Sequence, residues 1–291
     1  MNLRRYLLWL PYALAICAPT ATSQAVASGA PAKSSGDQLI CQVLAACGTT
    51  DRETARARER FAEFRRRLEL GNLAGAPVGS PVGSAVGDSA QRRARLIHEF
   101  IHTEILRGKF DPAGSDLAVT LAGGPFNCAS VSALFLALAA DLGVEAQAVS
   151  VTGHVWCRVT AEDYAFDVET TARQWFTIAR QNAAGGPDAA STAWQEHLRR
   201  SRAGRVLDQT SFLAIFHFNR GVSLLRSGRL GDAALANLRA IALDYRCRPA
   251  WENLWSAVLG WSQNWTEIVA TQRLRRSALT ATATEAVRFS P

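Results

Sequence analysis

The chain has 291 residues, of which 48% are hydrophobic and 20% are charged, values that are ordinary for a soluble globular protein of one or two domains. Its formal net charge of +7 comes almost entirely from arginine. The arginines are spread along the chain and several alternate with acidic residues, as in DRETARARERF from Asp51, so we interpret them as solvated helix faces. The sequence carries no nucleic-acid-binding motif, and we expect no nucleic-acid partner.

The first 27 residues have the pattern of a secretory signal peptide. Arg4 and Arg5 form a basic start, a short apolar run covers residues 6–17, and Ala25-Val26-Ala27 offers a cleavage site. The run is too short for a comfortable membrane span. We therefore expect an exported protein, periplasmic or secreted, without stable membrane insertion; an uncleaved anchor is the alternative.

Residues 28–88 are expected to precede the main domain. Residues 28–37 are rich in Ala, Ser, Gly and Pro, and residues 51–70 predict a charged helix. The segment GNLAGAPVGSPVGSAVGDS that follows is typical of a flexible connector. From Ala90 to about Leu106 the spacing of apolar residues predicts an amphipathic helix.

That helix contains a match to the H-E-x-x-H zinc-protease motif at His98 and His102. Residues four apart share one helix face, so the spacing suits a metal ion. A catalytic zinc site also needs a third protein ligand, and no extended form of the motif follows. We favour two amphipathic residues at the rim of the apolar face, with a zinc hydrolase as the lesser alternative.

A loop rich in Gly and Pro leads into a mostly buried helix predicted from Asn127 to Asp141, which Gly143 ends. Cys128 lies in its first turn. There, unused N–H groups and the helix dipole favour a thiolate and could stabilise an oxyanion. Cys128 is thus a candidate nucleophile.

Residues 144–169 predict β-strands. The two-residue period places His154 on a polar face and Cys157 toward the core, which argues against a metal shared by the two. On the next strand Asp167 and Glu169 share the polar phase, so His154 and Asp167 can be neighbours if the strands form a hairpin. Cys128, His154 and Asp167 would then supply a nucleophile, its base and the residue that orients the base.

The last third predicts helix pairs. The segment from Asn219, with a weaker copy about 35 residues later, resembles a tetratricopeptide repeat, whose length is ~34 residues. An ordinary helical cap is the alternative. Four aromatic residues either pack in a core or line a groove for a peptide: Trp251, Trp255, Trp261 and Trp265.

Residues 90–175 resemble the transglutaminase-like superfamily of cysteine enzymes, relatives of the papain-like proteases. The resemblance rests on Asn127-Cys128, Leu142-Gly143-Val144, Gly153-His154-Val155-Trp156 and Phe166-Asp167-Val168-Glu169-Thr170. It implies an α+β fold with a helix packed on an antiparallel sheet. It also implies Cys128 as nucleophile, His154 as base and Asp167 as its orienter.

Four regions are therefore expected: a signal peptide (1–27), a disordered or helical segment with a linker (28–88), a transglutaminase-like domain (89–205) and a helical tetratricopeptide-like domain (206–291). The predicted function is hydrolysis or acyl transfer at an amide bond of a protein or peptide, through a thioester acyl-enzyme and without a cofactor or metal. The C-terminal helices are expected to offer a surface for a protein partner. The alternative is a non-catalytic protein-binding module.

Overall fold

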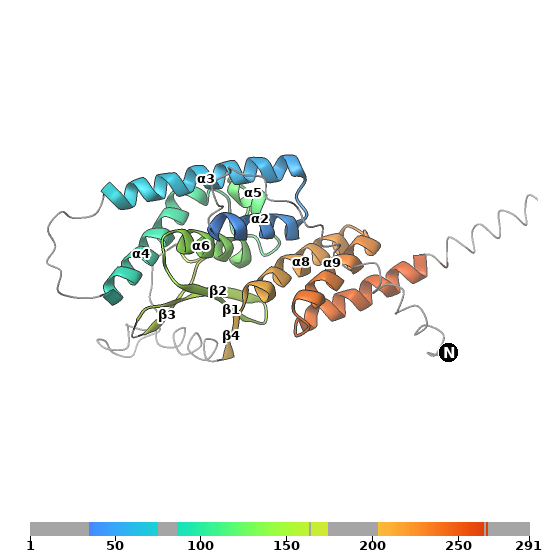
Figure 1. The fold of residues 1–291 in the computed structure, drawn as a ribbon. Helices are drawn as coiled ribbons and strands as arrows, with labels where there is room; N and C mark the ends of the chain where they lie inside the picture. Colours follow the sequence, from blue (N-terminus) through green and yellow to red (C-terminus); the bar gives the residue numbers. More distant parts are fainter. Residues whose placement is uncertain (1–34, 75–85, 163, 174–202, 265, 267–291) are drawn as a thin grey trace, which may run out of the picture. The chain divides into compact units, whose positions relative to one another are not determined.

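The computed structural model describes residues 35–74, 86–162, 164–173, 203–264 and 266. These residues form a mostly helical α+β protein with one four-stranded antiparallel sheet, which confirms the predicted fold class at this level (Figure 1). The predicted signal peptide lies outside the described residues. No helix in the described ranges is long and apolar enough to cross a membrane.

The sheet has the strand order β3-β2-β1-β4. Its strands are β1 (Ala146–Val151), β2 (His154–Thr160), β3 (Ala165–Val168) and β4 (Arg205–Leu207). Val151 pairs with His154, so β1 and β2 are joined by a two-residue turn whose Gly153 has a φ of 79°. A positive φ in such a hairpin turn suits glycine.

One helix crosses the inner face of the sheet. This is α6 (Cys128–Asp141), whose C-cap is Leu142, followed by Gly143 with a φ of 65°. Its apolar residues and Val155, Cys157 and Val159 of β2 belong to one buried core. The predicted inward phase of β2 is thereby confirmed.

Four further helical elements pack with α6 into the same unit (Figure 1). They are α2 (Ser35–Cys47), α3 (Asp51–Ala74), α4 (Val86–Phe100) and α5 (Leu117–Leu121). The helix predicted over 90–106 is α4, continued by a π-helical turn, η3 (Ile101–Ile105), in which the Leu106 N–H donates to Ile101 O.

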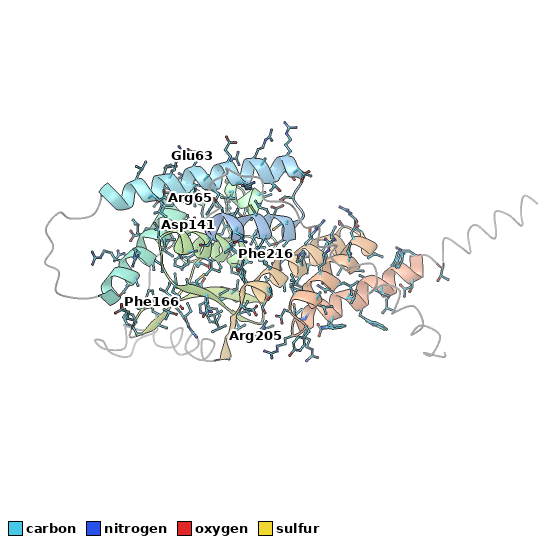
Figure 2. All side chains as sticks on the ribbon, viewed as in Figure 1. Glu63, Arg65, Asp141, Phe166, Arg205 and Phe216 are labelled. Carbon is cyan, nitrogen blue, oxygen red and sulfur yellow. The ribbon has the colours of Figure 1, made fainter. Side chains whose placement is uncertain are left out.

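The N-terminal helices are part of this core. Although α3 is densely charged, it buries Ala57, Phe61 and Leu68 at helical spacing. The Arg65 guanidinium lies 2.9 Å from a carboxylate oxygen of Asp37 and 3.8 Å from one of Asp141, which links α3 to α2 and α6. Figure 2 labels Arg65 and Asp141. Residues of α2 and α3 thus share one core with α6 and the sheet.

The C-terminal helices are α8 (Gln209–Arg226), α9 (Leu230–Leu243) and a helix over 248–264. Phe212 and Phe216 at the start of α8 belong to the core of α6 and the sheet, and all the described residues fall within one compact unit. The remaining buried apolar residues of these helices form two small clusters of their own, around Ala240 and around Ala236. Further along α8, Gly221 lies against Asn237 of α9 so closely that a Cβ there would meet its side chain at 2.4 Å.

Candidate functional site

Cys128 is the first residue of α6 and is partly exposed. Asn127 caps the helix: its Oδ1 accepts the N–H groups of Ala129 and Ser130 at 3.0 and 3.1 Å. The Ser130 hydroxyl in turn accepts the Asn127 N–H, which completes a capping box. The cap fixes the backbone around the thiol.

The same cap corrects one expectation about the first turn. Two of the first-turn N–H groups, those of Ala129 and Ser130, already donate hydrogen bonds to Asn127 Oδ1. The backbone N–H of Cys128 itself is the first-turn donor that the cap does not use. It is therefore our candidate for one oxyanion donor.

His154, the first residue of β2, meets Glu169 just after β3. The Nε2 of His154 lies 2.6 Å from Oε2 of Glu169. The other carboxylate oxygen, Oε1, accepts the backbone N–H and the hydroxyl of Thr171 at 3.2 and 2.6 Å. Glu169 is therefore held from two sides, with one oxygen directed to His154.

Asp167 does not take the place expected for it beside His154. Both of its oxygens accept from Arg158, at 2.6 Å from Nε and 2.9 Å from the terminal nitrogen. The strand register explains this arrangement, because Arg158 pairs directly with Asp167. The carboxylate that contacts His154 is that of Glu169, which follows two residues later, just after the end of β3.

The charges of the site favour a protonated His154. Hydrogen bonding with Cys128, then with Glu169, raises the His154 pKa to about 10, against the opposing effect of burial. Burial opposes the ionisation of Glu169, but hydrogen bonding and the charge of His154 hold its pKa below the usual value. The two shifts agree, and together they favour a cation and an anion in contact at neutral pH.

Burial raises the pKa of three other thiols. Cys157 is fully buried in the core, and desolvation raises its pKa far above the usual value. Burial also raises the pKa of Cys247, which is partly exposed like Cys128. Cys47 is half-buried, and desolvation raises its pKa to about 12.

The two histidines of the H-E-x-x-H match are engaged by backbone carbonyl groups. Nε2 of His98 lies 2.9 Å from Ala172 O, and Nε2 of His102 lies 3.0 Å from Thr170 O. Within the described residues, no group of three His, Cys, Asp or Glu side chains could hold a metal ion. The geometry therefore favours a structural use of the motif over the zinc alternative.

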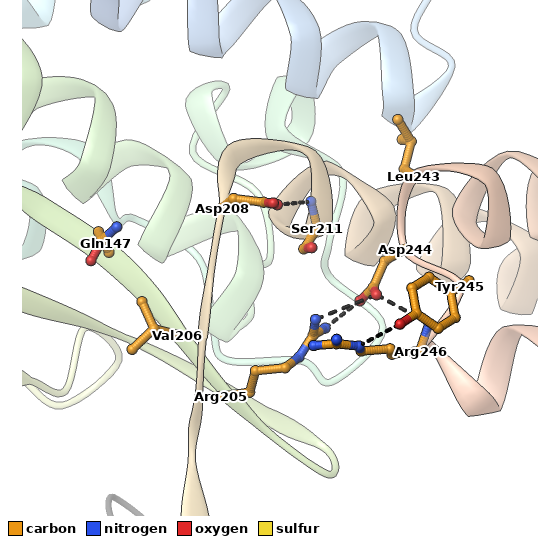
Figure 3. A pocket seen from close by; sticks show the side chains of 9 residues that line it. All are labelled: Gln147, Arg205, Val206, Asp208, Ser211, Leu243, Asp244, Tyr245 and Arg246. Atoms are coloured by element: carbon orange, nitrogen blue, oxygen red, sulfur yellow. Dashed lines mark hydrogen bonds and ion pairs between the residues drawn. The ribbon is translucent and has the colours of Figure 1, made fainter.

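A pocket of about 460 Å³ lies beside β4 (Figure 3). It is bounded by the ends of β1, β4 and α9 and by the start of α8, and an ion pair between Arg205 and Asp244 lies in it. Its lining holds no thiol or imidazole. None of the predicted site residues Cys128, His154 and Asp167 lines this pocket.

Comparisons of the chain with protein-family models, with curated proteins and with solved structures found no match. The resemblance to the transglutaminase-like superfamily therefore stays a prediction that rests on the residues quoted above.

Proposed function

We propose that this protein is an exported cysteine enzyme, transglutaminase-like in its site, that cleaves or transfers acyl groups at amide bonds of a protein or peptide. The observation that supports this proposal most is the hydrogen bond between His154 Nε2 and Glu169 at 2.6 Å. The influence of Cys128 on the His154 pKa is consistent with the thiol as the other partner of the imidazole. A nucleophile, a base and an orienting carboxylate in this order are the parts that thiol-dependent acyl transfer needs.

The proposed reaction has two steps. The Cys128 thiolate attacks the carbonyl carbon, His154 gives its proton to the departing nitrogen as the C–N bond breaks, and a thioester and an amine result. Water or a second amine then attacks the thioester, His154 takes the attacking group's proton, and the thiolate leaves. Glu169 orients the ring and stabilises its cationic form in the resting state.

The first test is selective alkylation of the resting enzyme. Iodoacetamide at pH 6 should modify Cys128 at least tenfold faster than Cys247 or Cys157, because a thiolate is the reactive species, Cys128 has the His154 cation as its partner, and burial raises the pKa of the other two thiols. Peptide mapping by mass spectrometry gives the rate at each site. Cys247 is the matched control, since it too is partly exposed. Equal slow rates at Cys128 and Cys247 would contradict the proposal.

Hydrolysis and transfer can then be separated with one protein substrate. Unfolded casein offers many amide groups, with or without a labelled primary amine. Release of ammonia or new chain ends alone indicates hydrolysis, and incorporation of the label indicates transfer. Either outcome should disappear in Cys128→Ser.

A protein-binding module is the second candidate, and the C-terminal aromatics favour it. Trp251, Trp255 and Trp261 are 50%, 65% and 57% exposed, so they do not form a core within the described residues; Trp265 lies outside them. We propose that this tetratricopeptide-like face binds a protein partner. Trp255→Ala should then change the free energy of unfolding by less than about 0.5 kcal/mol, measured by urea denaturation. A loss of several kcal/mol would instead assign Trp255 to packing.

A further inference from the structure

Glu169 lies on a segment that the sheet does not hold. The β2–β3 ladder ends at Val168, and residues 169–172 have no strand partner among the described residues. Backbone carbonyl groups in such a segment need other donors when they are shielded from water. Side chains from the two helical elements α4 and η3 supply them.

His98 and His102 donate to this segment at two points. Nε2 of His98 lies 2.9 Å from Ala172 O, and Nε2 of His102 lies 3.0 Å from Thr170 O. A carbonyl oxygen only accepts, so each ring must carry its proton on Nε2. His98 also interacts with the backbone of Glu169 itself.

The rings are suited to remain neutral donors. His98 is 2% exposed, and their ring centroids are 4.5 Å apart. Burial, together with the nearby His102, lowers the pKa of His98 to about 4, and burial lowers the pKa of His102. A neutral imidazole with its proton on Nε2 is a defined donor at physiological pH, whereas two adjacent cations would repel each other.

A third contact joins the same segment to the helix of the nucleophile. The hydroxyl of Thr170 lies 3.0 Å from that of Ser132. Ser132 is one helical turn after Cys128 on α6 and so shares its helix face. Segment 169–172 is thus fastened to α4, η3 and α6 at once.

The helix itself is distorted where it makes this contact. His102 lies in the π-helical turn η3, with Leu106 N bonded to Ile101 O at 2.9 Å. π-Helical turns are rare in proteins, and many of those that occur lie at functional sites. The distortion coincides with the residue that holds Thr170.

We propose that His98 and His102 are positioning residues, which hold segment 169–172 so that the Glu169 carboxylate meets His154. The role of this contact in catalysis rests on the proposed function. That His98 and His102 keep Glu169 against His154 can be tested without it. We call this pair of hydrogen-bond donors the clamp. In this proposal the H-E-x-x-H match serves as the clamp and not as a metal site.

The test compares His102→Gln with His102→Leu. Glutamine keeps an N–H donor near the position of Nε2, and leucine removes it. The readouts are the NMR titration of the His154 imidazole and the rate of Cys128 alkylation at pH 6. We expect His102→Leu to lower the pH of His154 deprotonation by at least one unit and to slow alkylation about tenfold, with His102→Gln close to wild type.

His217→Leu is the matched control. His217 is another partly buried histidine, on α8, whose pKa burial lowers to about 4. Its replacement should leave the His154 titration unchanged. An unchanged titration in His102→Leu, an equal shift in His217→Leu, or no recovery with His102→Gln would each overturn the proposal.

Two further measurements test the inference if a variant does not fold or if the proposed enzyme function fails. If His102→Leu does not fold, ¹⁵N NMR of the wild type decides, because the clamp requires both His98 and His102 to carry the proton on Nε2. If Cys128 of the wild type reacts no faster than Cys247, the proposed enzyme function fails. The His154 titration still reports on the clamp in that case.

Discussion

Glu169→Gln should reduce turnover of an amide substrate by about 10²–10⁴-fold while leaving the protein folded. Glutamine keeps the size of the side chain and removes the charge that stabilises the His154 cation at 2.6 Å. The amide nitrogen can also face Nε2, which disfavours the required orientation of the ring. The pH at which His154 loses its proton should fall, since Glu169 is one of the two partners that raise the His154 pKa to about 10.

Asp167→Asn is the matched comparison, because it makes the same chemical change at a carboxylate two residues earlier in the chain. Asp167 is 6% exposed and accepts two bonds from Arg158. Its neutralisation should cost roughly 1.5–3 kcal/mol of stability, the range for hydrogen bonds to charged groups. It should not change the His154 titration.

Three measurements on both variants separate the two roles: the urea midpoint, the NMR titration of His154, and the rate of casein turnover or of Cys128 alkylation. If Glu169 orients His154, Glu169→Gln should change the His154 titration and the reaction rate, and Asp167→Asn should lower the urea midpoint. The reverse pattern would return the orienting role to Asp167.

The sequence predicts which face of the sheet each site residue occupies, but not which residues of neighbouring strands lie opposite each other. Alternation along β2 and β3 assigns His154, Asp167 and Glu169 to one face without any structure. Which carboxylate meets the histidine depends on how the two strands slide past each other, and alternation repeats every two residues. One signal was available: Thr171, two residues after Glu169, can donate both its N–H and its hydroxyl to that carboxylate.

The same limit applies to the H-E-x-x-H match and to the domain boundaries. Helical spacing shows that His98 and His102 share a face, but their partners are carbonyl oxygens about 70 residues away, which no local pattern reveals. Charge dominates the sequence of α3 and suggests a solvated helix. The apolar stripe that α3 buries consists only of Ala57, Phe61 and Leu68, so it is easily missed among the charged residues.

Leu68→Ala should therefore destabilise the whole unit by about 2–5 kcal/mol, the cost of removing a buried leucine side chain from a core. Leu68 is 2% exposed and shares one core with α6 and the sheet. Leu70, two residues later on the same helix, is 66% exposed, and Leu70→Ala should change stability by less than about 0.5 kcal/mol.

Hydrogen exchange at the backbone amides of β2 makes the test specific to the sheet. If α3 is integral to the core, Leu68→Ala should reduce the protection of Val155 and Cys157 as much as it lowers the global free energy of unfolding. Unchanged protection there would mean that residues 35–74 fold separately from the sheet. The site on Cys128, His154 and Glu169 would then need support only from the part of the chain after residue 86.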